Sequence, residues 1–132
     1  MVTGGVLKLP AAPNRDLLKV EEISGQNPFA CYQCGKCAAG CPVAHHMDLT
    51  PVQVLRLLQL GDARVLEAES PWICASCLAC SVRCPKGVDI PSLMEAIRLV
   101  ALRKGIVRGP LPRWADDLPQ IALVGAMRKA SP

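Results

Sequence analysis

Apolar residues recur at helical spacing in the last third of the chain. Between Pro91 and Gly105 they are Leu93, Met94, Ile97, Val100 and Ala101. Intervals of three and four residues place them on one face of a helix, whereas Arg98, Arg103 and Lys104 fall on the other face. A proline suits the first turn of a helix, and a glycine suits its end. The pattern predicts an amphipathic helix that begins near Pro91 and ends at Gly105.

A leucine-rich helix is predicted over 51–60. Asp48 and Thr50 are candidate caps, Pro51 suits the first helical position, and Gly61 is placed to end the helix. The apolar residues are too widely spread for one stripe. This helix is therefore expected to be buried on more than one side or to contact a partner.

Capping residues predict two shorter helices. Asn14 is placed to cap a helix that continues to about Ser24, and Asp62 to cap one over about 63–68. The inward-facing residues of the first are expected to be Leu17, Leu18 and Val20. Because the long insert between 42 and 74 has helical rather than alternating patterning, the fold class is expected to be mainly α.

Two copies of one string contain all eight cysteines. Residues 31–42 read CYQCGKCAAGCP and residues 74–85 read CASCLACSVRCP, so each copy has the spacing C-x2-C-x2-C-x3-C-P. This spacing is a ligand set for cubane iron–sulfur clusters, in which the fourth cysteine, before the proline, ligates the other cluster. The spacing therefore predicts one [4Fe–4S] cluster on Cys31, Cys34, Cys37 and Cys84, and a second on Cys74, Cys77, Cys80 and Cys41.

Zinc sites and disulfides are the alternative uses of these cysteines. A four-ligand zinc site would leave the fourth cysteine and its proline without a role in both copies. Eight cysteines in 132 residues is dense enough for a disulfide framework. The N-terminal residues lack the apolar run of a secretory signal, so we expect a cytoplasmic protein rather than an oxidising compartment.

Several side chains close to the motifs have expected roles. Phe29 is expected to pack against the first cluster loop. Arg83 and Lys86 either raise the potential of the second cluster, dock an acidic partner, or are simply solvated. Because the cysteines already supply two cubanes, His45 and His46 are expected to be exposed or hydrogen-bonded rather than ligands.

The charge balance changes this interpretation little. The side chains carry a formal +4. Eight thiolates and two oxidised cluster cores add roughly −4, so the loaded protein is near neutral. No basic run is interleaved with aromatic residues, and no apolar stretch reaches the ~18 residues of a membrane span. Neither a nucleic-acid partner nor a membrane span is expected.

Three parts of the chain are expected. Residues 1–28 form an N-terminal arm and short helix, 29–105 form a dicluster domain, and 106–132 form a loop and a helix over about 118–128. The apolar residues of that last helix exceed what a small domain can cover, so this segment is a candidate docking tail. They are Leu118, Ile121, Val124 and Met127.

The stretch from Cys31 to Gly105 resembles HdrC, the small iron–sulfur subunit of heterodisulfide reductase. The resemblance rests on CYQCGKCAAGCP, the leucine-rich helix, and W-x-C-x-x-C-x-x-C-x-x-R-C-P-x-G-V-D-I from Trp72 to Ile90. It implies an α-helical ferredoxin with two [4Fe–4S] clusters in loops between helices. It also implies partners: an HdrA-like flavin subunit that supplies electrons and an HdrB-like catalytic subunit that reduces the disulfide. Further dehydrogenase or hydrogenase subunits are additional candidate partners.

An electron-transfer subunit without a catalytic centre of its own is the expected function. No nucleophile–base set or phosphate-binding loop is present, and fully cysteine-ligated cubanes offer no open iron to a substrate. The alternatives are the equivalent relay subunit of anaerobic glycerol-3-phosphate dehydrogenase or thiol-driven fumarate reductase, a relay attached to further dehydrogenases, and a cluster-based sensor. Nothing in the sequence identifies the terminal substrate.

Overall fold

The computed structural model describes residues 14–106 and 119–121, which are helical and contain no β-strand. The mainly α fold expected from the sequence is therefore confirmed. The elements follow in the order α1 (Arg15–Ser24), η1 (Pro28–Ala30), α2 (Lys36–Ala39), η2 (Ala44–His46), α3 (Pro51–Leu60), η3 (Ala63–Leu66), α4 (Ser70–Ile73), α5 (Ala79–Arg83) and α6 (Ile90–Arg103), where η denotes a 3₁₀ helix.

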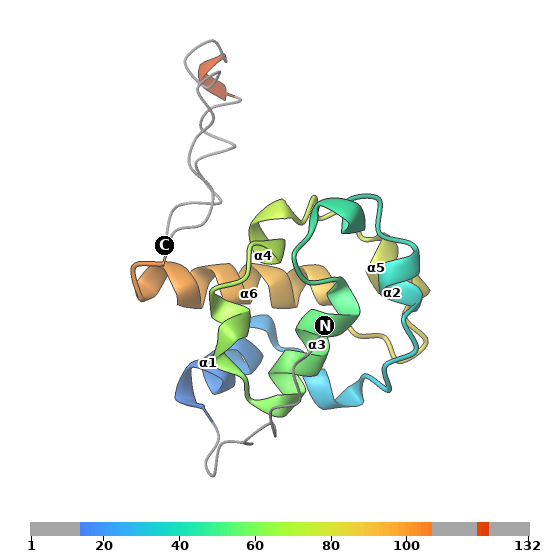
Figure 1. The fold of residues 1–132 in the computed structure, drawn as a ribbon, viewed down its shortest axis with the longest axis horizontal. Helices are drawn as coiled ribbons and strands as arrows, with labels where there is room; N and C mark the ends of the chain where they lie inside the picture. The colour runs from blue at the N-terminus through green and yellow to red at the C-terminus, as the bar shows by residue number, and fades with distance from the viewer. Residues whose placement is uncertain (1–13, 107–118, 122–132) are drawn as a thin grey trace, which may run out of the picture.

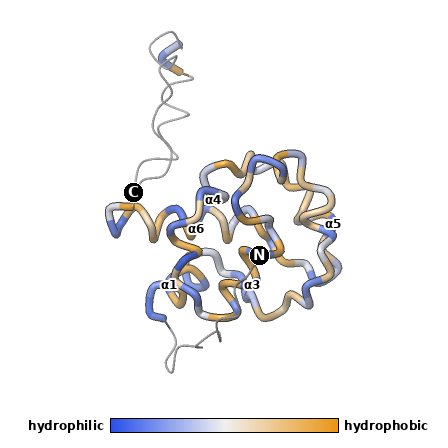
Figure 2. Tube along the Cα trace, in the orientation of Figure 1, coloured by the Kyte–Doolittle hydropathy of each residue, from blue (hydrophilic) through white to orange (hydrophobic). Residues whose placement is uncertain are grey.

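The core is built on α6, the longest of these helices. Figure 1 shows α6 crossing the molecule with α1 and α4 beside it, and contacts join α6 to α1, α4, α5 and η3. The five apolar residues predicted for its buried face are all buried, and Leu93 and Met94 are fully enclosed. Figure 2 shows orange stretches in α3 and α6 interrupted by blue ones, the pattern of amphipathic helices.

Capping residues set the helix boundaries. Asn14 accepts a hydrogen bond from the N–H of Asp16 at 3.0 Å and so begins α1. Thr50 and Gln53 form a capping box at the start of α3. Gly25 and Gly61 end α1 and α3 with φ of +65° and +69°, a region that favours glycine. These boundaries match the predicted ones.

Three side chains differ from expectation. Leu18 is 47% exposed, because α1 contacts the core through Leu17 and Val20. Phe29 is 64% exposed and does not pack into the first loop as predicted. Arg98 is 7% exposed rather than on a solvent face, because α4 packs against α6 and covers it. The helical period identified one buried face of α6 but could not show that a second element covers the opposite side.

The predicted C-terminal helix and docking tail lie mostly outside the described residues. Residues 120 and 121 are helical, and Ile121 is 85% exposed. Among the described residues, no helix has the length and apolar character needed to cross a bilayer.

Candidate iron–sulfur cluster site

The two cysteine loops share one backbone course. The first leads into α2 and the second into α5. Two residues after the first cysteine of each motif, φ is positive, +65° at Gln33 and +54° at Ser76. It is positive again two residues further on, at Gly35 (+78°) and Leu78 (+64°). This region costs a residue with a Cβ on the order of 1 kcal/mol. Its recurrence at equivalent positions shows that both loops are wound in the same way despite their different residues.

Backbone N–H groups point at sulfur atoms of both motifs. The N–H of Gln33 donates to Cys31 Sγ at 3.3 Å, and that of Val88 donates to Cys84 Sγ at 3.4 Å. Such bonds stabilise the thiolate form of a cysteine. Hydrogen bonds to the sulfurs also help to set the reduction potential of a bound cluster.

Exposure differs among the cysteines of each loop. Cys34 and Cys77, the second cysteine of each motif, are exposed, whereas Cys37 and Cys74 are buried. Burial raises the pKa of Cys37 to about 11, and it also raises the pKa of Cys80. A buried thiolate needs a compensating positive charge, which a coordinated metal supplies.

Cys41 lies with the cysteines of the second motif. It lines one narrow pocket together with Cys74, Cys77 and Cys80. Apolar residues supply much of the remaining wall, among them Met47, Pro51, Ile90 and Met94. The last cysteine of the first motif is thus brought to the three loop cysteines of the second.

Cys84 lies with the cysteines of the first motif. The pKa of Tyr32 is raised first by its hydrogen bond to Cys34, and further by the charges of Cys84 and Cys31. Lys86, two residues after Cys84, lies with its Nζ 5.8 Å from the centroid of the Tyr32 ring, which brings the segment around Cys84 to the first loop. The two groups of cysteines adjoin each other, because α2, which contains Cys37, packs against α5, which contains Cys80.

The chemistry of these donors fits iron–sulfur clusters. All eight cysteines are free thiols. Their sulfurs are distributed around two loops, and within the described residues no three His, Cys, Asp or Glu side chains converge as ligands of a single ion. A polynuclear cluster is held by thiolates at its separate corners, so distributed sulfurs suit it. His45 and His46 are exposed, and their ring centroids lie 4.0 Å apart.

Polar side chains outside the motifs hold the loops in place. Gln59 of α3 donates through Nε2 to the carbonyl oxygens of Pro28 and Cys31, both at 2.8 Å. The buried Arg98 donates through Nη1 to the carbonyl of Pro71 at 2.5 Å. The first bond anchors the entrance of the first loop, and the second anchors α4, which leads into the second loop.

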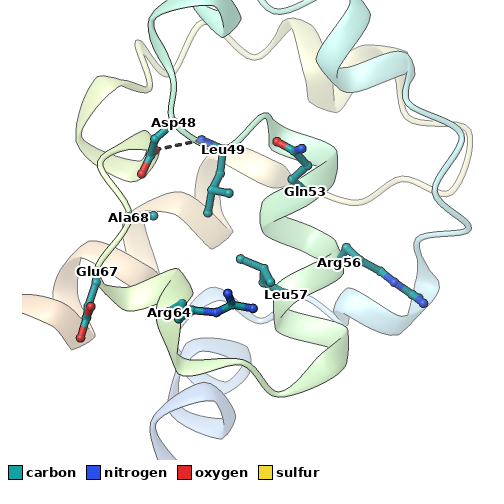
Figure 3. Close-up of a pocket in the computed structure, with 8 residues that line it drawn as sticks. All are labelled: Asp48, Leu49, Gln53, Arg56, Leu57, Arg64, Glu67 and Ala68. Carbon is teal, nitrogen blue, oxygen red and sulfur yellow. Dashed lines mark hydrogen bonds between the residues drawn. The ribbon is translucent and has the colours of Figure 1, made fainter. Parts of the chain in front are cut away.

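Asp48 also holds the start of α4. Its carboxylate accepts the backbone N–H groups of Leu49, Glu69 and Ser70 at 2.9 to 3.0 Å, and Figure 3 shows its bond to Leu49. It lies 2.5 Å from the hydroxyl of Ser70, which is fully buried. Burial alone would raise the pKa of Asp48, but these hydrogen bonds outweigh it and lower the pKa.

A cavity of about 670 Å³ next to Asp48 contains no cysteine. Figure 3 shows it between α3 and the segment around η3, with apolar Leu49, Leu57 and Ala68 and a polar rim. Two of the polar rim residues already have partners: Arg64 pairs with Asp62, and Gln53 accepts from Thr50. This cavity is separate from the cysteine groups.

The sequence indicated all eight cysteines as candidate ligands but did not predict the roles of Gln59 and Arg98 or the bonds of Asp48. Gln59 and Arg98 interrupt apolar runs, which was the available signal. Their partners are backbone carbonyls far along the chain, and no local pattern specifies such a pairing.

Comparison with known proteins agrees with this site. The 4Fe–4S dicluster domain family matches residues 29–88. The chain is therefore a dicluster iron–sulfur protein, and its cofactors are two [4Fe–4S] clusters. Within that class it is similar, over most of its length, to the HdrC subunits of heterodisulfide reductase.

Three relatives illustrate the similarity. The HdrC subunit of the ferredoxin:CoB-CoM heterodisulfide reductase of Methanosarcina mazei is 34% identical over 105 residues, which are 80% of this chain and 65% of the relative. The corresponding iron–sulfur subunits of the CoB–CoM heterodisulfide reductases of Methanocaldococcus jannaschii and Methanopyrus kandleri are 38% and 39% identical over 58% of this chain, covering 41% and 40% of their own lengths. The chain thus spans less than two thirds of these relatives.

Proposed function

We propose that this protein is an electron-transfer subunit of a heterodisulfide reductase-like complex, relaying electrons from an HdrA-like flavin subunit to an HdrB-like catalytic subunit. The bound clusters supply one-electron redox chemistry. The residues of this chain hold them in two adjoining sites, bury one side of each and leave the other accessible. The names of the relatives support the choice of complex.

The grouping of the cysteines carries this proposal. Cys41 shares a pocket with Cys74, Cys77 and Cys80. Lys86, two residues after Cys84, lies over the ring of Tyr32, which stands between Cys31 and Cys34 in the first loop. We therefore assign each fourth cysteine to the cluster of the other motif, which gives two sites with four thiolates each. A site with four protein ligands has no open position for a substrate, which suits a relay rather than a catalyst.

Exposure supports a path through the protein. Cys34 and Cys77 place a ligand of each cluster at the surface, so each cluster has an edge that a partner can approach. The packing of α2, which contains Cys37, against α5, which contains Cys80, supports two sites that adjoin inside the protein. An electron can enter at one exposed edge and leave at the other without crossing the whole domain.

Anaerobic reconstitution tests the proposal. Iron and sulfide analysis should give eight of each per chain, from two cubanes. The reduced protein should show EPR signals broadened by magnetic coupling between neighbouring clusters. Purification of the native complex should bring down HdrA-like and HdrB-like subunits. A three-iron centre, or a substrate that perturbs one cluster directly, would contradict the relay function.

A further inference from the structure

Arg83 packs on Gly40 at the junction of the two cysteine motifs. A Cβ placed on Gly40 would lie 2.7 Å from Arg83 Cδ and Nε and 2.8 Å from Cζ. The guanidinium therefore occupies the space that any larger side chain at 40 would need. The contact joins α5, which ends at Arg83, to the residue that follows α2, and these two helices lie side by side (Figure 1).

Gly40 is not required by the backbone. Its φ is −99° and its ψ is 1°, which a residue with a Cβ can adopt. Gly25, Gly35 and Gly87 differ, because each has positive φ and open space where a Cβ would go. The feature that demands glycine at position 40 is the arginine side chain above it.

The two residues hold equivalent places in the repeat. Gly40 directly precedes Cys41, and Arg83 directly precedes Cys84. Where the two copies meet, one supplies a large cation and the other supplies the room for it. Two arginines at these positions would compete for the same space, and two glycines would leave it without a charge.

Ligands of both clusters flank this contact. Under the proposed crossed ligation, Cys37 and Cys84 belong to the first cluster, while Cys41 and Cys80 belong to the second. Within residues 14–106 no carboxylate forms an ion pair with Arg83. The segments 27–47 and 70–88 contain no Asp or Glu. The carboxylate of Asp89, which follows the second segment, accepts hydrogen bonds from Ser81 and Ser92 instead. The positive charge of Arg83 is therefore not neutralised by an ion pair within residues 14–106.

We propose that Arg83, seated on Gly40, is a positive charge shared by the two clusters that raises the reduction potential of both. This inference rests on the proposed function, since it requires two clusters with crossed ligands. An added electron makes a cluster more negative, so a nearby cation stabilises the reduced form. Because the cation lies between both sites, it favours reduction of each and lowers the repulsion when both are reduced.

Redox titration of the cluster-loaded protein, followed by EPR, tests this role. Arg83→Gln should make both clusters harder to reduce, by about tenfold in the equilibrium constant, which is about 59 mV for a one-electron couple. Arg83→Lys keeps the charge and should stay close to the wild type. Arg103→Gln removes an exposed arginine at the far end of α6 and is the matched control for net charge.

Gly40→Ala gives an independent probe. The added methyl meets the far end of a flexible side chain rather than backbone, so it should displace Arg83 with little loss of stability. It should shift both potentials in the same direction as Arg83→Gln, but less. Adding Gly40→Ala to Arg83→Gln should cause no further shift, because the charge is already gone.

Several results would overturn the inference. One is an Arg83→Gln protein whose reduction equilibrium constants stay within about twofold of the wild type, and another is a shift in the potential of one cluster alone. An equal shift in Arg103→Gln, or shifts from Gly40→Ala and Arg83→Gln that simply add in the double variant, would also overturn it. If Arg83→Gln failed to retain iron, unchanged potentials in Gly40→Ala would decide against it. A wild-type protein with fewer than two clusters would instead refute the proposed function, before any variant is compared.

Discussion

Replacing Asp48 with alanine should loosen the second cysteine motif selectively. The carboxylate accepts three backbone N–H groups and faces the buried Ser70 hydroxyl. Two of the N–H groups belong to Glu69 and Ser70, at the start of the helix that ends at Cys74. Alanine removes every one of these acceptors, so the attachment of α4 to the segment before α3 is weakened to the bonds between Ser70 Oγ and the backbone of Leu49.

The size of the effect follows from the number and exposure of these bonds. A hydrogen bond to a charged group contributes about 1.5–3 kcal/mol, and water replaces the exposed ones at part of that cost. Since Asp48 is itself exposed, we take the low end, about 2 kcal/mol in total. Because 1.4 kcal/mol corresponds to a tenfold change in an equilibrium constant, the equilibrium constant for local opening of this segment should increase roughly 30-fold.

The assay is iron release from the native, loaded protein to an excess of chelator. If release follows local opening, Asp48→Ala should lose the iron of one cluster about 30-fold faster, and the other cluster should keep its wild-type rate. Asp62→Ala is the matched control, because Asp62 also caps a short helix and also has a lowered pKa, owing first to its hydrogen bond with the Arg64 side chain. Equal acceleration in both variants, or wild-type release in Asp48→Ala, would refute the reasoning.

Three further predictions concern other parts of the chain. Lys104 lies 2.6 Å from Asp16 and lowers the pKa of that carboxyl. Lys104→Met should therefore lose under about 1 kcal/mol at pH 7 in denaturant titrations, and the difference should shrink as the pH falls below about 3.8 and Asp16 is protonated. Gln59→Leu should leave two carbonyls of the first loop without their donor and speed iron loss from the first cluster relative to the second. Deletion of residues 113–132 should leave both clusters in place but abolish association with the larger subunits; loss of iron on deletion would instead make the tail part of the core.

The helices that could be predicted were those with both a capping residue and apolar residues at helical spacing. Asn14, Thr50 and Gly61 mark their ends, and the spacing of the apolar residues identified the buried face of α6. The helical spacing gave the wrong burial for Leu18 and Arg98. Elements distant in sequence determine which sides of a helix are covered. The residue pattern of one helix does not indicate which other elements pack against it.

The cysteine spacing was enough to propose the ligands, but the side chains that support the site could be found only in the structure. Gln59, Asp48 and Arg98 act through backbone groups that lie more than twenty residues away. The contact between Gly40 and Arg83 likewise joins the two motifs across the fold. Sequence repeats show that two positions are equivalent, whereas only the structure shows that they touch.

The crossed ligation is the central claim, and combined cysteine replacements test it most directly. Cys31→Ser removes a ligand from the first cluster, and EPR with iron analysis then follows the second. If the ligands cross, adding Cys84→Ser should leave the second cluster intact, because both changes fall on the first. Adding Cys41→Ser should instead destroy the remaining signal. The opposite result, in which Cys84→Ser removes the second cluster and Cys41→Ser spares it, would contradict the account.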